Sequence, residues 1–422
     1  IYEKFRDAKV DGLFVPHCNF GTEYEVCRLA KKLNVPVLLW GPRDECPDEN
    51  GMRLRDSQCG LFATGKVLRR FGIPFTYLKN CNLEDECFAE GIDRFLRVCN
   101  VVKAFRNTRV LQISTRPFDF WSTMCNEGEL LEKFGIQLSP IPMPELTQAM
   151  KDVKENSPEE IKEVTDYCRE KMCIKVTPEQ LDNVAALKIA MTRLGKKYGC
   201  NCGAIQCWNA LQDEIGIMPC AANALCNDEG FPIACETDIH GTITSVLVEA
   251  AAMGETRSFF ADWTVRHPYN DNAELLQHCG PWPISIAKEK PTIDTPVAFD
   301  CSGSLMAQAK DGEHISLVRF DGDNGEYSLL LGNAKTVDGP YTKGTYMWVE
   351  VENLDRLEDK LVQGPYIHHC VGVHQDVVPV LYEACKYIGV TPDLYDPIEE
   401  KVKAIIRGEK VAKKAAAAGV LS

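Results

Sequence analysis

From residue 1 to about residue 140 the chain alternates short apolar runs with longer amphipathic stretches. Runs such as "GLFV" and "PVLLW" are almost continuously apolar, which is typical of strands covered on both faces. Stretches such as "TEYEVCRLAKKL" place apolar residues at helical spacing between those runs. Strands that alternate with helices in this way predict a parallel sheet with crossover helices.

Between about residues 143 and 200 the pattern changes to charge-rich helices. One of them has a defined start, because Ser157 precedes Pro158 and Glu160 follows three residues after Ser157, which predicts a capping box. "CGAIQCW" and "FPIACETD" then return to the pattern of buried strands. We therefore expect a helical layer that covers the parallel sheet.

After about residue 255 short aromatic and β-branched runs are joined by turns such as "GDNGE" and "KDGEH". This pattern predicts an antiparallel sheet or a barrel. "QDVVPVLYEACKYIG" predicts a closing helix, and the lysine- and alanine-rich end predicts a surface helix with a frayed tail. The fold class is therefore α/β, with parallel-sheet domains followed by a β-rich, antiparallel or barrel-like C-terminal domain.

Composition and charge exclude several classes of partner. The chain has 422 residues, 61 of them acidic and 47 basic, so its net charge is -14, and it contains no basic block. Nucleic acid and anionic membranes both attract clustered positive charge, so neither is an expected partner. No apolar run reaches the ~20 residues that span a bilayer, and no charged segment followed by an apolar one opens the sequence, so we expect a cytoplasmic protein.

The 20 cysteines are scattered singly through apolar segments, and no C-x-x-C pair occurs. A small secreted scaffold with disulfides would use cysteine differently, and zinc-ribbon spacing is absent. Reduced, buried thiols in a cytoplasm are the favoured interpretation.

Polar side chains follow several of the predicted strands. In parallel α/β sheets ligands meet residues at the carboxyl ends of strands, so these clusters are candidates for a site. They are His17 and Asn19, Thr115 and Arg116, Trp208 with Asn209, Gln212 and Glu214, and Glu236 with Asp238 and His240.

Glu214 and Asp238 both follow strand-like runs, so neighbouring parallel strands would bring the two carboxylates to one rim. Two close carboxylates stay ionised when a cation or hydrogen-bond donors compensate, and a hard divalent ion such as Mn²⁺ or Mg²⁺ is the usual solution. The alternatives remain open: Asp238 is also placed to cap the helix "GTITSVLVEAAAMG", and Glu214 to be a solvated acid in a turn.

Three of the eight histidines, His368, His369 and His374, fall at the junction before the closing helix. Adjacent residues on an extended segment point opposite ways, so one of His368 and His369 can face a given site. An imidazole with two carboxylates would make a mixed nitrogen and oxygen cation site. A structural or surface role for the His-His pair is the alternative.

Taken together, "DGLFVPHCNFGTEYEV", "ISTRP", "WNALQDEIG", "ACETDIHGTIT" and "HHCVGVHQD" resemble the L-fucose isomerase and L-arabinose isomerase superfamily, closest to its shorter, fucose-isomerase-like branch. The resemblance runs through most of the chain in order. It implies a cytoplasmic, homo-oligomeric (trimeric or hexameric), metal-dependent aldose–ketose isomerase. It also implies a first α/β domain reduced to residues 1–50, a second at 51–232 and a β-rich domain at 233–422.

By the same resemblance Glu214, Asp238 and His369 are the metal ligands, and Glu214 and Asp238 move a proton between C1 and C2 of a free sugar through an enediolate. Mn²⁺ is the expected ion, with Co²⁺ or Mg²⁺ as alternatives. The residues expected to hold the substrate are Arg116, Gln206, Trp208, Asn209, His368 and His17.

Substrate identity stays open, because the N-terminal part is shorter than in classical fucose isomerases. A pentose or an L-fucose-like deoxyhexose is the main expectation. Arg43, Arg53, Arg55 and Arg116 near predicted loops suit an anionic, for instance sulfonated, sugar as an alternative. A non-catalytic sugar-binding or regulatory protein on the same scaffold, or a metallohydrolase, would account for the same residues.

Overall fold

The computed structural model describes residues 1–296 and 300–409 of the chain. It divides into two compact units, one made of Ile1–Cys99 with the segment that starts at Pro397, and one made of Asn100–Asp396. The predicted domain boundaries after residues 50 and 232 stay predictions.

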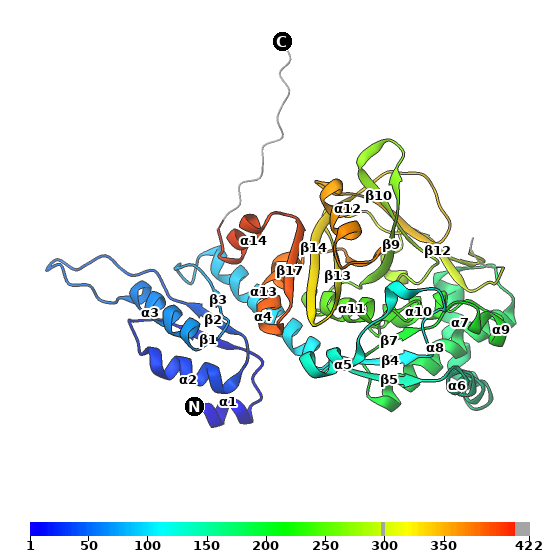
Figure 1. Ribbon diagram of the computed structural model, residues 1–422, viewed down its shortest axis with the longest axis horizontal. Helices are drawn as coiled ribbons and strands as arrows, with labels where there is room; N and C mark the ends of the chain where they lie inside the picture. Colours follow the sequence, from blue (N-terminus) through cyan, green and yellow to red (C-terminus); the bar gives the residue numbers. More distant parts are fainter. Residues whose placement is uncertain (297–299, 410–422) are drawn as a thin grey trace, which may run out of the picture. The chain divides into compact units, whose positions relative to one another are not determined.

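The first unit is a small α/β sandwich, whose three strands are drawn in blue in Figure 1. Strands β1 (Leu13–Pro16), β2 (Val37–Trp40) and β3 (Thr76–Tyr77) form a parallel sheet in that order. All four residues of β2 are buried, as expected for a central parallel strand covered on both faces. Its helices are α1 (Tyr2–Asp7), α2 (Glu23–Leu33), α3 (Ser57–Arg70), the first part of α4 (Glu86–Arg106) and α14 (Glu399–Ile406).

The second unit opens with a four-stranded parallel sheet in the order β5-β4-β7-β8. Its strands are β4 (Arg109–Ile113), β5 (Gln137–Ile141), β7 (Cys202–Ile205) and β8 (Ile233–Ala234). The predicted parallel sheet is therefore confirmed. The helices of this part are α5 (Glu127–Glu129), α6 (Met143–Asn156), α7 (Pro158–Lys171), α8 (Pro178–Tyr198), α9 (Ala210–Ile215) and α10 (Cys220–Asp228), with short turns at Trp121–Thr123 and Leu130–Phe134.

The capping box predicted at the start of α7 is wrong. The Ser157 side chain makes no capping bond, because its hydroxyl and the Glu160 carboxylate both accept from the Arg193 guanidinium, at 2.9 and 2.7 Å. A capping box does form at the start of α8, where the side chains of Thr177 and Gln180 each bond to the other's backbone N–H.

The β-rich part contains a closed barrel, which confirms the predicted antiparallel or barrel-like sheet. Strands β13, β14, β15, β10, β9 and β16 pair in a ring, each antiparallel to the next. Closure leaves no free edge among these six strands. Their bounds are β9 (Phe259–His267), β10 (Asn270–His278), β13 (Ile315–Asp323), β14 (Glu326–Val337), β15 (Thr345–Glu350) and β16 (His369–Val373).

Further strands extend the ring into a ten-stranded sheet, with β17 (Thr391–Asp396) beside β14 and with β12 (Ser304–Gln308), β11 (Thr292–Asp294) and β6 (Cys173–Ile174) beyond β15. Helices α12 (Leu354–Gln363) and α13 (Val378–Ile388) complete this part, and α13 is the predicted closing helix. The predicted frayed tail lies outside the described residues.

Helix α11 (Ile239–Ala251) connects the two sheets of the second unit. Nearly all of its residues are buried, and it packs against β4 and β7 on one side and against β13 and β16 on the other. Its N-terminus therefore opens between the parallel sheet and the barrel, at the carboxyl end of β8, which is where ligand sites form in such folds.

Among the described residues no helix has the length and hydropathy needed to cross a membrane. All 20 cysteines are free thiols, and the predicted burial holds for 11 of them, whereas five are half-buried and four are exposed.

Candidate active site

Four buried polar atoms face one another where α11 meets the barrel. The Nε2 atom of His369 lies 3.2 Å from Glu236 Oε2 and 3.6 Å from Asp262 Oδ1. The Nε2 atom of His278 lies 3.6 Å from the same Glu236 oxygen and 3.8 Å from the same Asp262 oxygen. None of the four atoms has a well-aligned hydrogen-bond partner within the described residues. Orphaned donor atoms of this kind are what a cation site presents.

The barrel strands fix three of these residues. Asp262 on β9 lies directly opposite His369 on β16, so the pairing of these two strands places both side chains on one face of the sheet. His278 ends β10 and is the next residue after Gln277. Because paired strands hold their side chains in register, the separation between these groups is set by the sheet itself.

Glu236 comes from the turn between β8 and α11, and the backbone of this turn is strained. Glu236 and Thr237 both have left-handed φ angles, 56° and 54°, which are unusual for an acid and for a β-branched residue. The turn is held by the Thr237 N–H, which donates to Ile205 O at 3.0 Å, and by its hydroxyl, which donates to Thr115 O at 3.0 Å. Such strain costs about 1–3 kcal/mol per residue and concentrates at functional sites.

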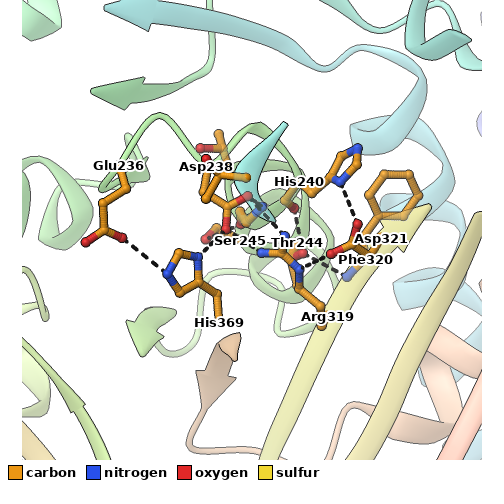
Figure 2. A network of polar contacts seen from close by, with 12 residues as sticks. Glu236, Asp238, His240, Thr244, Ser245, Arg319, Phe320, Asp321 and His369 are labelled. Atoms are coloured by element: carbon orange, nitrogen blue, oxygen red, sulfur yellow. Dashed lines mark hydrogen bonds and ion pairs between the residues drawn. The ribbon is translucent and has the colours of Figure 1, made fainter. Parts of the chain in front are cut away.

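Asp238 contacts the Nδ1 atom of the His369 ring, whereas Glu236 lies beside the Nε2 atom (Figure 2). Its Oδ2 lies 2.8 Å from His369 Nδ1, and its Oδ1 accepts from the Gly241 N–H at 2.9 Å as the N-cap of α11. A carboxylate on Nδ1 holds a proton there, so Nε2 is the ring nitrogen that faces Glu236 and Asp262, and it can bind a cation once its own proton has been displaced. This is the usual arrangement behind a histidine that binds a metal.

Arg319 balances the charges of two buried acids, Asp238 and Asp321 (Figure 2). Its guanidinium bonds to both oxygens of Asp238, the Nη2 contact being 3.1 Å, and its Nε donates to Asp321 Oδ2 at 2.9 Å. Asp321 in turn lies 2.9 Å from His240 Nδ1. Burial alone would raise the pKa of Asp238, but the charge of Arg319 and the bond from His369 hold it well below its usual range.

The two histidines of the cluster differ. Burial opposes a charge on His369, yet its contact with Asp238 and the nearby carboxylate of Glu236 raise its pKa to about 9. His278 also has a raised pKa, because Asp262 and Glu236 outweigh the effect of burial. However, His278 Nδ1 accepts the Cys279 N–H at 2.9 Å, so its Nε2 carries the proton and the ring donates toward the carboxylates. Glu236, Asp262 and His369 are therefore the set that fits a divalent cation, with His278 bracing the two acids.

Aromatic rings line the approach to this cluster. Phe120 stacks on Trp208 at 5.3 Å between ring centres and lies 5.4 Å from His369 and 5.7 Å from His368. Donor atoms of His368, His369 and Asp262 all lie within 4.8 Å of one another, so His368 stands beside the cluster. The loops that follow β4 and β7 thus border the polar centre with a face on which a sugar ring could rest.

The other predicted substrate residues lie on the same two loops or elsewhere. Gln206 accepts the Ser114 hydroxyl at 2.7 Å, and Arg116 is half-buried and donates to the carbonyls of Pro117 and Phe118. Asn209 is exposed, with a φ angle of 63°. His17 is buried in the first unit.

The structure does not bring Glu214 into the cluster. It lies exposed on α9, and no ion pair or hydrogen bond among the described residues joins it to Asp238 or His369. Asp238 is fully buried and both of its oxygens are engaged, so neither is directed at the open centre. The roles predicted for Glu214 and Asp238 stay predictions, and the structure offers Glu236 and Asp262 in their place.

Sequence reasoning noticed Glu236 without assigning it a role, and missed Asp262 and His278. The signal for both lies in the pattern, since each interrupts an apolar strand, in "SFFADWTV" and "ELLQHC". A charged side chain in such a run is rarely buried unless it is paired or binds a metal.

Comparisons with known proteins find sugar isomerases among the relatives of this chain. The family model described as the N-terminal domain of fucose/sulfoquinovose isomerase matches residues 1–106. The sulfoquinovose isomerases of Priestia aryabhattai and of Priestia megaterium are each 24% identical over 400 residues, covering 93% of this chain and 87% of theirs. That of Alkalicoccus urumqiensis is 24% identical over 357 residues, covering 83% of this chain and 79% of its own.

Proposed function

The chain belongs to the fucose-isomerase-like family of sugar isomerases, and from that premise we propose that it is an aldose–ketose isomerase whose substrate is a sulfonated sugar such as sulfoquinovose. The observation that carries the activity is the convergence of the free Glu236, Asp262 and His369 atoms on one point. The relatives support the anionic substrate over the L-fucose-like sugar that the sequence resemblance first implied.

We propose that Glu236, Asp262 and His369 hold a divalent cation. Two carboxylate oxygens and one imidazole nitrogen form a mixed set that suits Mn²⁺, with Co²⁺ and Mg²⁺ as alternatives. When bound, such an ion polarises the carbonyl and the neighbouring hydroxyl of the sugar, which lowers the cost of removing the adjacent proton. The Asp238 and Arg319 contacts keep His369 in the tautomer that this role requires.

The proton transfer falls to the carboxylates of the same cluster. Isomerisation removes a proton from one of C1 and C2 and returns it to the other, so the base must lie beside both carbons. The Asp262 side chain is 26% exposed, whereas the Glu236 side chain is 7% exposed. We propose that Asp262, on the open side, exchanges the proton with the substrate, and that Glu236 stays ionised between His278 and His369.

The anionic end of the substrate needs a cation near the approach. Arg116 follows β4 on the loop that also carries Phe120, and it forms no ion pair with a carboxylate among the described residues. Its guanidinium is thus available to a sulfonate, for which a planar fork of N–H donors is well suited. We propose that Arg116 selects the sulfonated sugar, while Trp208 and Phe120 support the ring.

The experiment is a substrate panel with added Mn²⁺ in which ketose formation is followed for sulfoquinovose, L-fucose, D-arabinose and L-arabinose. We expect turnover of sulfoquinovose, and a kcat/KM for it that falls about 10- to 100-fold in Arg116→Met, the effect of losing charged hydrogen bonds. Any turnover of a neutral sugar should change little in that variant. Isomerisation of a neutral sugar alone would refute the substrate assignment and leave the isomerase standing.

Two substitutions test the site itself. Glu236→Gln should abolish turnover and lower Mn²⁺ occupancy, measured by elemental analysis, whereas Glu214→Gln removes an exposed carboxylate on α9 and should change neither. Loss of turnover and of Mn²⁺ in Glu214→Gln, with neither lost in Glu236→Gln, would support the role predicted for Glu214 from sequence and refute the proposed cation site.

A further inference from the structure

A second cluster of donor atoms lies in the first unit. The two thiol sulfurs of Cys81 and Cys87 and a carboxylate oxygen of Asp85 all lie within 4.8 Å of one another. The chain brings them together through the turn that begins α4. Asp85 accepts the Asn82 N–H at 2.8 Å through its side chain, and its own N–H donates to Asn82 O at 3.3 Å. This turn folds Cys81 back onto the first turn of the helix.

The surroundings leave the sulfurs able to act as ligands. Trp40 Nε1 donates to Cys81 Sγ at 3.2 Å, so this sulfur already serves as an acceptor. Cys87 is half-buried and lies in the first turn of a 21-residue helix, so the helix fixes its position relative to Asp85. Both cysteines and Asp85 line a cavity of about 660 Å³, so a small ion can reach them.

We propose that Cys81, Asp85 and Cys87 bind one thiophilic divalent cation, of which zinc is the natural candidate. Two thiolates and a carboxylate are a ligand set that zinc accepts, and three protein ligands leave one position open toward the cavity. The set carries three negative charges when ionised, which a divalent ion and the neighbouring Arg43 and Lys79 on the cavity wall balance. The oxygen- and imidazole-rich site in the second unit has no thiol among its ligands, so the two sites differ in chemistry.

This site is independent of the proposed isomerase activity. A cation bound here would tie the segment after β3 to the start of α4 and so brace the first unit. A disulfide between Cys81 and Cys87 is the competing use of the same two thiols.

Cobalt is the probe, because a thiolate bound to Co²⁺ gives a charge-transfer absorption in the near ultraviolet that oxygen and imidazole ligands do not. The full chain, kept reduced and stripped of metal, is titrated with Co²⁺. We expect this absorption in the wild type and in Cys59→Ser, which removes an exposed thiol on α3, and its loss in both Cys81→Ser and Cys87→Ser. Asp85→Asn should weaken Co²⁺ binding and keep the absorption.

Zinc then competes for the site, and one equivalent should abolish the cobalt absorption. The proposal is overturned if the wild type shows no thiolate absorption, or if the absorption survives in Cys87→Ser, whose half-buried position makes it the substitution safer for folding. It is also overturned if the purified chain contains a Cys81–Cys87 cross-link that reductant does not open before metal is added.

Discussion

Arg319 should be one of the most important single side chains for the stability of the second unit. It is 1% exposed and joins two acids, Asp238 with a side chain 1% exposed and Asp321 with one 10% exposed. Replacing it with methionine keeps most of the volume and removes the charge, which leaves both carboxylates buried without their counter-ion. Breaking a buried pair in this way costs about 3–5 kcal/mol, out of a total stability of about 5–15 kcal/mol.

The chain contains a matched control. Arg266 also contacts two acids, Asp355 and Glu358, but its side chain is 40% exposed and the Asp355 side chain is 87% exposed. Water takes over when such a contact is lost, so Arg266→Met should change stability little. The two variants lose the same formal charge from the same sheet and differ in burial.

Thermal unfolding, followed by tryptophan fluorescence at pH 7, measures the difference. For a unit of this size each kcal/mol shifts Tm by about 2–4 °C, so Arg319→Met should lower it by ~10 °C and Arg266→Met by far less. Adding Asp238→Asn and Asp321→Asn to Arg319→Met should recover part of the loss, because the uncompensated charges disappear. Equal shifts in the two single variants would refute the argument that burial decides the cost.

Three further predictions follow from single contacts. Burial, with the nearby charge of Glu358, raises the pKa of Glu274 to about 7, so the folded state holds a proton that the unfolded chain releases near its ordinary value of 4.5. The free energy of unfolding should therefore fall as pH rises from about 4.5 to 7. Glu274→Gln should remove this pH dependence, measured by urea titrations, and should add about 2–3 kcal/mol to the free energy of unfolding at pH 8. An unchanged pH dependence in the variant would contradict this prediction. Asp238→Asn should weaken Mn²⁺ binding by about 10- to 100-fold, measured by calorimetry, because the imidazole it orients loses its anchor; unchanged affinity would exclude a positioning role. Gly372→Ala should destabilise the protein by about 1–3 kcal/mol or more, because the new Cβ would lie 2.1 Å from an aromatic carbon on β9. The control is Gly128→Ala, whose new Cβ would have its nearest neighbour at 3.5 Å and should be tolerated. Similar denaturation midpoints for the two variants would contradict this prediction.

Local pattern was sufficient to predict the parallel sheets and the β-rich part, and insufficient for the closure of the barrel. The alternation in the first third of the chain reports burial directly, so β1, β2 and β4 could be expected where they lie. Closure depends on β14 pairing with β15 at its far end while β13 pairs with β16. These are choices among several β-prone segments, and they are made by packing between residues distant in sequence.

The site shows the same limit. Asp238 was open to two interpretations, a cation ligand or the N-cap of the next helix, and the structure shows it as the N-cap with an added bond to His369. The link to Glu214 assumed that residues after neighbouring strands share a rim, but α9 intervenes and leaves Glu214 exposed. Asp262 was missed because an acid that interrupts an apolar strand indicates a buried, paired side chain but does not indicate which residues distant in sequence it meets.

In the second unit the residues proposed for the proton transfer and those proposed to contact the far end of the sugar lie on different elements. Asp262 and His369 lie on paired barrel strands, and Glu236 lies on the turn before α11, which is bonded to the end of β7 and to Thr115 shortly after β4. The groups proposed to contact the far end of the sugar, Arg116 and Trp208, lie instead on the loops after β4 and β7. Loops tolerate replacement far better than paired strands do. Substitutions of Arg116 and Trp208 should therefore change which sugar binds without disturbing the atoms proposed to transfer the proton.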